Sequence, residues 1–302
     1  MLKIRLTRLP ALLLGAQIAL IITGGAVRLT KSGLGCPTWP ECTKGSYTPS
    51  EDQVEPLINI WIEFANRMLT FVLVALAIVT FGWVLKSGRK NLRFLAFLQI
   101  LGIFGQAVLG GITVLTNLNP AAVAGHLLLS IALIYGAVLL NERSRDYPKA
   151  APLTSAGVLL VRVVFSLTLL VIIVGTVVTG SGPHAGDKAA PRYNFDLRMV
   201  TWLHADLVIA LCGAIFALYL LLKLAPISSS PEARDNHLKL MKTFIFLVLI
   251  QGGIGYLQYF TGVPIILVGL HLLGLSLVWL TACKLLIRTS VRTSTKRHAN
   301  LS

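Results

Sequence analysis

The strongest constraint on the fold is a series of eight long apolar stretches, which leave little of the 302-residue chain outside them. A helix that spans a lipid bilayer needs about 20 mostly apolar residues, and here 55% of the residues are hydrophobic whereas only 13% are charged. This balance excludes a soluble domain and predicts an all-α integral membrane protein. The expected spans lie near residues 11–29, 57–85, 93–116, 120–141, 157–179, 197–224, 239–261 and 264–288.

Basic residues are concentrated in every second connection between these spans. Most of the 27 lysines and arginines lie at the two chain ends and after the second, fourth and sixth spans. By the positive-inside rule, both termini are then cytoplasmic, and we expect a multi-pass protein of a bacterial cytoplasmic membrane. A basic surface for anionic lipid or nucleic acid is the alternative account of the +15 net charge. We expect membrane lipid, and no nucleic acid, as a partner.

Two of the four cysteines, Cys36 and Cys42, lie in the long connection after the first span. The expected topology places this connection outside the cytoplasmic membrane, where thiols oxidise, so we predict a short disulfide. A zinc site is the alternative, but no histidine lies nearby in the sequence. Cys212 and Cys283 fall inside apolar spans and are interpreted as packing residues.

The chain carries the same pattern twice. Gln106 stands twenty residues before His126, and Gln251 stands twenty residues before His271, in each case within glycine-rich apolar segments. We interpret this as a tandem duplication into two four-helix bundles, residues 1–145 and 146–302. Because each copy has an even number of spans, the copies keep one orientation and are related by an axis along the membrane normal.

Two histidines of the second half are expected at the same depth. His204 and His271 each lie about seven residues from the extracytoplasmic end of their spans, which is roughly 10 Å at ~1.5 Å per residue. Two imidazoles at one level on facing helices are the axial ligands of a six-coordinate b-type heme. The alternative is a pair of hydrogen-bonded core histidines, although polar groups inside a span usually have a function.

The corresponding positions of the first half are Asn66 and His126, so this site is expected to be asymmetric. An amide is a poor iron ligand, whereas Glu63 and Arg67 share one helix face with Asn66 at i, i+3 and i+4. A carboxylate beside an iron with one strong ligand favours chemistry over electron transfer, and Glu63 is our candidate catalytic residue. Alternatively, Glu63 and Arg67 form an ion pair near the membrane surface, or Arg67 holds a heme propionate.

The ordered motifs of roughly residues 8–288 resemble the heme A synthases. The resemblance rests on eight spans in two halves, the outer-loop segment CPTWPEC, and the helix motif ExxHR, here EFANR. Glu63 and Arg67 match that motif, whereas Asn66 replaces its histidine. His126, His204 and His271 match the other family histidines, and Cys36 and Cys42 match the family's outer-loop cysteine pair. A second cysteine pair, between the fifth and sixth spans, is missing here.

The resemblance implies conversion of heme O to heme A, in which the C8 methyl of the porphyrin is oxidised to a formyl group through a hydroxymethyl stage. Heme O would lie in the first half with His126 as its single strong ligand and with Asn66 and Arg67 beside it. Glu63 would lie near the methyl, and heme b would be held by His204 and His271 and pass electrons. Heme O synthase and an electron carrier are possible partners.

Other polar residues have expected secondary roles. Arg28, Lys31, Arg67, Arg192 and Arg198 are candidate partners of heme propionates. We expect His184 to be solvated or near a propionate, and His237 and His298 to face the cytoplasm without binding iron. The rival interpretation is a di-heme b-type cytochrome that takes electrons from quinol. A transporter built from parallel repeats is less favoured, because the polar residues gather near the outer surface rather than the midplane.

Overall fold

The computed structural model describes residues 8–50, 53, 55–145, 153–224 and 231–290. Within these ranges the chain forms eight α-helices, each long and apolar enough to cross a membrane. They are α2 (Leu9–Leu29), α3 (Leu57–Lys86), α4 (Lys90–Leu115), α5 (Pro120–Ser144), α6 (Ser155–Ser181), α7 (Leu197–Leu224), α8 (Pro231–Phe260) and α9 (Ile265–Ser290). The prediction of an all-α multi-pass membrane protein is confirmed.

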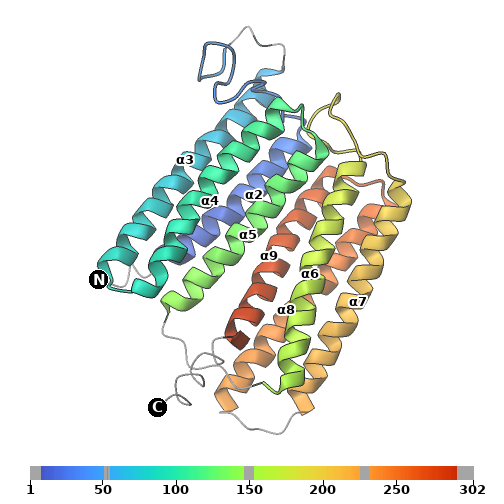
Figure 1. Cartoon of the computed structure of the whole chain (residues 1–302). Helices are drawn as coiled ribbons and strands as arrows, with labels where there is room; N and C mark the ends of the chain where they lie inside the picture. Colours follow the sequence, from blue (N-terminus) through green and yellow to red (C-terminus); the bar gives the residue numbers. More distant parts are fainter. Residues whose placement is uncertain (1–7, 51–52, 54, 146–152, 225–230, 291–302) are drawn as a thin grey trace.

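The helices form two groups of four that stand side by side (Figure 1). In the first group α2 contacts α3, α3 contacts α4, α4 contacts α5, and α5 contacts α2. The second group forms the same ring of contacts, from α6 through α7 and α8 to α9 and back to α6. Consequently α3 and α5 lie at opposite corners of one bundle, and α7 and α9 at opposite corners of the other. A cofactor bound between opposite corners would contact both helices.

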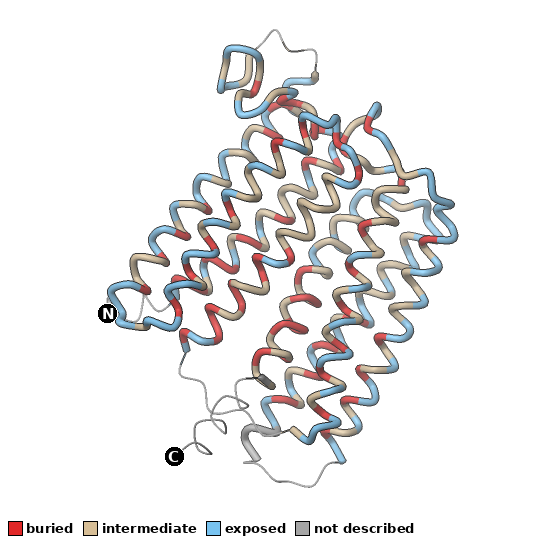
Figure 2. The backbone as a smooth tube through the Cα atoms, in the orientation of Figure 1, coloured by how far each residue is buried: buried red, intermediate tan, exposed pale blue. Residues whose placement is uncertain are grey.

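The two groups meet through α2, α5, α6 and α9. Buried residues occur along these inner helices (Figure 2). Trp279 on α9 donates its indole N–H to the Ile131 carbonyl of α5 over 2.8 Å. Glu142 on α5 pairs with Arg288 on α9, with 2.9 Å between Oε2 and Nε. Specific polar contacts therefore reinforce the apolar interface between the halves.

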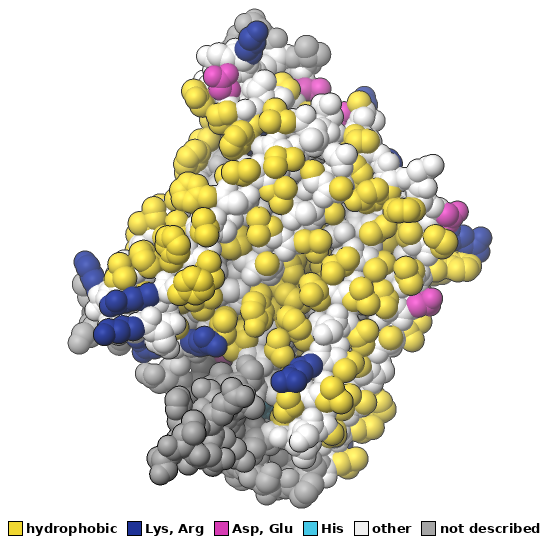
Figure 3. All heavy atoms as spheres, in the orientation of Figure 1, with side chains coloured by type: hydrophobic (Ala, Val, Ile, Leu, Met, Phe, Trp, Pro, Cys, Tyr) yellow, Lys and Arg dark blue, Asp and Glu magenta, His cyan; other side chains and the backbone are white. Residues whose placement is uncertain are grey.

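The molecule has two opposite ends, which we call the loop end and the tail end. The loop end carries the described residues of the connections 30–56 and 182–196 and the turns that join α4 to α5 and α8 to α9. The tail end lies opposite, where α2 begins and α9 ends. Hydrophobic side chains cover the middle of the face shown in Figure 3, and lysines and arginines gather toward its lower edge. This surface suits a bilayer, with its apolar middle facing the hydrocarbon.

The α4–α5 and α8–α9 turns have matching geometry. Leu118 and Val263, which are 145 residues apart, have φ of 61° and 60°. The Leu118 N–H donates to the Thr113 carbonyl over 2.8 Å, and the Val263 N–H donates to the Gln258 carbonyl over 2.8 Å. The same offset of 145 relates His126 to His271. These matched contacts support the interpretation of a tandem duplication.

Candidate functional site

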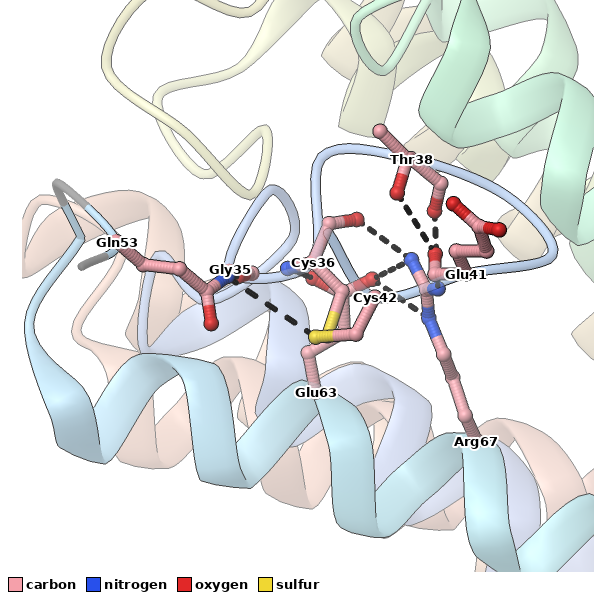
Figure 4. A network of polar contacts seen from close by, with 8 residues as sticks. All are labelled: Gly35, Cys36, Thr38, Glu41, Cys42, Gln53, Glu63 and Arg67. Carbon is pink, nitrogen blue, oxygen red and sulfur yellow. Dashed lines mark hydrogen bonds and ion pairs between the residues drawn. A yellow bond between two sulfur atoms is a disulfide. The ribbon is translucent and has the colours of Figure 1, made fainter. Parts of the chain in front are cut away.

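Glu63 lies nearly two helical turns inside α3, which begins at Leu57 at the loop end, and its carboxylate faces the outer connection (Figure 4). Its Oε2 accepts the backbone N–H of Cys36 over 2.8 Å, and its Oε1 accepts Arg67 Nε and Nη2 over 3.0 and 2.6 Å. The Glu63 side chain is 6% exposed. A buried carboxylate is tolerated when a cation and further hydrogen-bond donors surround it, as here.

Arg67 uses the rest of its guanidinium to hold the same connection. Nη1 donates to the Thr38 and Glu41 carbonyls over 3.0 and 3.1 Å, and Nη2 donates to the Cys36 carbonyl over 2.6 Å. These carbonyls belong to the segment closed by the Cys36–Cys42 disulfide, which confirms the predicted pairing. Glu63 and Arg67 therefore anchor the disulfide loop to α3, and of the two alternatives to catalysis the ion pair is present.

The disulfide loop also packs closely on the helices beneath it. A Cβ added at Gly35 would lie 2.8 Å from the Asn59 carbonyl oxygen at the start of α3. The Trp39 ring lies against Gly111 of α4, where a side chain on the helix would collide with the ring. Both glycines permit a close approach that no larger residue allows. The loop thus covers the loop end of α3 and α4.

Asn66 lies on the next helical turn from Glu63 and faces α2 instead of the loop. Its Oδ1 accepts the Thr23 hydroxyl over 2.7 Å, and its Nδ2 lies 4.0 Å from where a Cβ on Gly24 would be. On the opposite corner, a Cβ on Gly110 of α4 would lie 3.3 Å from His126 Nε2. Small residues thus flank both side chains that the sequence assigns to the first site.

The second half repeats this arrangement with a histidine in place of the asparagine. A Cβ on Gly175 of α6 would lie 3.2 Å from His204 Cε1, and a Cβ on Gly255 of α8 would lie 3.6 Å from His271 Cε1. His204 lies on α7 and His271 on α9, at opposite corners of the same bundle. The structure therefore brings together, across one bundle, the two histidines that the sequence paired by depth.

Glutamines fix the backbone beside the histidines of α5 and α9. Gln106 Nε2 donates to the His126 carbonyl over 3.1 Å, and Gln251 Nε2 donates to the His271 carbonyl over 2.6 Å. In the first half Gln106 also donates to Ser130 Oγ over 2.7 Å. The repeated spacing of glutamine and histidine, noticed first in the sequence, is thus a repeated contact between adjacent helices.

The residues of the second half fit a bis-histidine heme. Within the described part of the chain, Nδ1 of His204 and Nδ1 of His271 are both buried without a hydrogen-bond partner. Buried polar atoms rarely remain unpaired in folded proteins, and an unpaired one calls for an explanation such as a ligand. The two rings lie on opposite helices of the bundle, and each packs against a glycine of a neighbouring helix. The described residues hold no group of three or more His, Cys, Asp or Glu side chains arranged for a metal ion.

Most of the basic side chains that the sequence suggests as partners of heme propionates contact other protein groups. Arg28 Nη2 donates to the Thr179 carbonyl over 2.9 Å, which links α2 to α6. The Arg198 guanidinium lies 4.4 Å from the centre of the Trp202 ring. Arg192 donates to backbone carbonyls of its own connection. Of the five candidates, Arg28 lies most deeply between the two halves, and its Nε is buried without a partner among the described residues.

The remaining histidines lie away from the paired rings. His184 Nε2 lies 2.8 Å from the Val263 carbonyl, so it ties the 182–196 connection to the α8–α9 turn. Its side chain is half-buried, and the expectation that it is solvated or near a propionate stays a prediction. His237 is buried near the start of α8 at the tail end. His298 lies outside the described residues.

The sequence alone did not indicate three features of the site: the hydrogen bond from Thr23 to Asn66, the glycines beside each histidine and the attachment of Glu63 to the disulfide loop. The signal for the glycines was present, because Gly110 and Gly255 lie sixteen residues before His126 and His271. No sequence signal fixes which way Glu63 points.

The fold and the site define a class of protein: an eight-helix membrane protein with histidines facing the interior of its bundles. Residues 8–283 match the model of the cytochrome oxidase assembly protein family. The chain belongs to this family.

Several bacterial relatives are named heme A synthase. The chain is 30% identical over 180 residues to one from Shewanella oneidensis, which covers 55% of this chain and 54% of that protein. It is 36% identical over 125 residues to one from Lysinibacillus sphaericus, covering 40% and 39%, and 26% identical over 289 residues to one from Halalkalibacterium halodurans, covering 88% and 91%. The chain thus matches about half or less of the first two relatives and nearly all of the third.

Proposed function

We propose that this protein is a heme A synthase, an oxidoreductase that converts the C8 methyl of heme O to a formyl group through a hydroxymethyl intermediate. The observation that carries the proposal is the pair His204 and His271, whose buried Nδ1 atoms have no partner among the described residues. Membership of the cytochrome oxidase assembly family and relatives named heme A synthase support it. Heme O and heme A are accordingly the substrate and the product. The conversion balances when one water molecule supplies the oxygen atom, four protons are released, and a membrane electron carrier accepts the four electrons.

In this proposal each half of the chain binds a different heme. Residues 146–302 would hold heme b through His204 and His271, and residues 1–145 would hold heme O with His126 as the ligand of its iron. Heme b would supply a centre that accepts and passes on electrons. Asn66 lies on the helix opposite that of His126, and its bond to Thr23 keeps its amide directed at α2. Because an amide is a poor iron ligand, this half would be suited to chemistry instead of electron transfer.

Glu63 has two functions in the proposal. It anchors the disulfide loop, and it is the carboxylate closest along α3 to Asn66, so it serves as base or as a stabiliser of positive charge near the substrate methyl. Arg67, which is fully engaged by Glu63 and three loop carbonyls, positions Glu63 and leaves propionate binding to others. Arg28, with its partnerless Nε, is the propionate contact that we favour.

The disulfide supports the orientation of the chain. Cys36 and Cys42 lie at the loop end, and stable disulfides form outside the cytoplasm. Since α2 begins and α9 ends at the tail end, both termini are then cytoplasmic, in agreement with the charge distribution. Heme O, itself a membrane molecule, enters sideways from the lipid. Heme O synthase and a membrane electron carrier are the partners that this route requires.

The test is to express the protein together with a heme O synthase in cells that lack heme A, and to identify the extracted hemes by chromatography and mass. We expect heme A from the parent chain and none from Glu63→Ala. Because Glu63 also anchors the loop, Glu63→Gln is the sharper variant: it keeps the shape and removes the charge. Arg67→Lys is the matched control, since it disturbs the same anchor without removing the carboxylate.

Two outcomes decide between catalysis and anchoring. If Glu63→Gln abolishes heme A while its disulfide stays intact and Arg67→Lys retains activity, the carboxylate acts on the substrate. If both variants lose heme A and expose free thiols to the same extent, Glu63 is an anchor only. Recovery of heme b with unconverted heme O from the parent chain would instead favour the rival, a di-heme cytochrome that takes electrons from quinol.

A further inference from the structure

A groove of about 530 Å³ opens between α8 and α9 in the tail-end half of the molecule. Its outer part carries three cationic side chains, Lys239, Lys284 and Arg288, and its inner wall is made largely of leucines such as Leu247 and Leu277. At ~1.5 Å per residue along a helix, Leu247 lies about 12 Å deeper than Lys239. The groove therefore has a charged mouth and an apolar floor.

Among the described residues, Lys239 and Lys284 form no ion pair, whereas Arg288 pairs with Glu142 of α5. Asp235 lies a helical turn before Lys239 and is exposed to solvent. The two lysines therefore place positive charge at the mouth, and an anion bound there would be attracted to it.

The lysines are a property of the second half and not of the tail end in general. At the offset of 145 that relates His126 to His271, Lys239 corresponds to Phe94 and Lys284 to Leu139. The positive-inside rule explains cations at the ends of the helices, such as Lys86 and Lys90 in the first half. It does not explain lysines on the helix faces that line a groove.

We propose that this groove binds an anionic phospholipid of the cytoplasmic leaflet, with its phosphate at Lys239 and Lys284 and an acyl chain along Leu247 and Leu277. Basic pockets between spans on the cytoplasmic side are suited to acidic headgroups. The leucine wall selects an amphiphile over a soluble phosphate, because the half-buried Leu247 and Leu277 offer an apolar contact to an acyl chain and none to a free phosphate. The proposal rests on the cytoplasmic orientation of the tail end and is independent of the heme chemistry.

The experiment is a lipid titration of the full-length, heme-loaded protein in detergent, followed by native mass spectrometry. The probes are phosphatidylglycerol and phosphatidylcholine with identical acyl chains. We expect one high-affinity phosphatidylglycerol that phosphatidylcholine does not replace. Lys239→Gln/Lys284→Gln should weaken it by about 25-fold, since each lysine near an anionic lipid contributes ~1 kcal/mol, a factor of about five.

The matched control is Lys86→Gln/Lys90→Gln, which removes two exposed lysines from the same end of the first half and should leave affinity unchanged. Lys239→Glu keeps the proposal testable if Lys284 proves necessary for folding, because Lys239 is exposed. Leu247→Trp should abolish binding by filling the floor while all cations remain. An unchanged thermal unfolding transition confirms that each variant is folded.

Three results would overturn the proposal: equal affinity for the two lipids, equal losses in the groove variant and the control, or displacement of bound lipid by millimolar glycerol phosphate. The last would indicate a soluble-anion site to which the leucine wall contributes nothing.

Discussion

The Thr23 hydroxyl donates a 2.7 Å hydrogen bond to Asn66 Oδ1. When the segment TGGAVRLTKSGLG, which begins at Thr23, is aligned with VGTVVTGSGPHAG, Val174 corresponds to Thr23, and His204 takes the place of Asn66. The first half thus pairs an amide with a hydroxyl, whereas His204 Nδ1 has no hydrogen-bond partner among the described residues. On the duplication hypothesis, the two halves diverge at the residue that we expect to decide coordination.

Replacing Asn66 by histidine should make the first half resemble the second. We expect Asn66→His, combined with Thr23→Val to remove the competing hydroxyl, to convert the first-site heme to a low-spin form. Heme A production should fall by at least about tenfold, the usual cost of disturbing a group next to a metal ligand. Optical and electron paramagnetic resonance spectra, with heme extraction, measure both effects. Unchanged activity and spectra would show that the asymmetry of the first site has no role.

The glycines beside the histidines give a second prediction with an internal control. A Cβ on Gly175 would press on His204 at 3.2 Å, whereas a Cβ on Gly24 would lie 4.0 Å from Asn66 Nδ2 at ordinary contact distance. Gly175→Ala should displace the imidazole and lower heme b content, with an overpacking cost of about 1–3 kcal/mol. Gly24→Ala should be neutral or slightly stabilising, because alanine favours a helix. The measurements are the amount of heme b per protein and the thermal unfolding temperature of each variant. Equal heme b content in the two variants would contradict the role of Gly175.

The sequence predicted the features that depend on position along a helix. The number of spans follows from the length of the apolar stretches, and the matched depth of His204 and His271 follows from counting residues along each span. The Cys36–Cys42 disulfide follows from the oxidising compartment in which the loop is expected. The structure agrees with the spans and the disulfide. The duplication and the catalytic assignment of Glu63 stay predictions.

What the sequence left undetermined depends on rotation about the helix axis and on the path of a loop. Spacing places Glu63, Asn66 and Arg67 on one face, but only packing against α2 and the folded-back disulfide loop directs Asn66 to Thr23 and Glu63 to the Cys36 N–H. Such contacts join residues tens of positions apart, and local propensity carries no information about them.

Arg67 should be necessary for the stability of the loop end. Arg67→Ala would leave the Glu63 carboxylate buried beside Cys36 without its cation, which costs about 3–5 kcal/mol when a buried pair loses one partner. Glu41→Ala is the control, because its side chain bonds only the exposed Gly45 N–H and its backbone carbonyl remains for Arg67. Thermal unfolding and alkylation of Cys36 and Cys42 after mild reduction report the effect. Equal melting temperatures for the two variants would refute the anchor.

Trp279 should hold the two halves together. Its indole donates to the Ile131 carbonyl over 2.8 Å, and its ring lies 5.0 Å from that of Phe165. Trp279→Phe keeps most of the ring contact and should cost about 1 kcal/mol for the lost hydrogen bond, whereas Trp279→Ala should cost about 3–5 kcal/mol through the cavity. Trp202→Ala is the control, since that side chain is 52% exposed. Thermal unfolding in detergent measures the stabilities of the three variants, which should rank Trp202→Ala, Trp279→Phe and Trp279→Ala from least to most destabilised. If Trp202→Ala proved as destabilising as Trp279→Ala, the indole would contribute no more at the junction of α5, α6 and α9 than at the lipid surface.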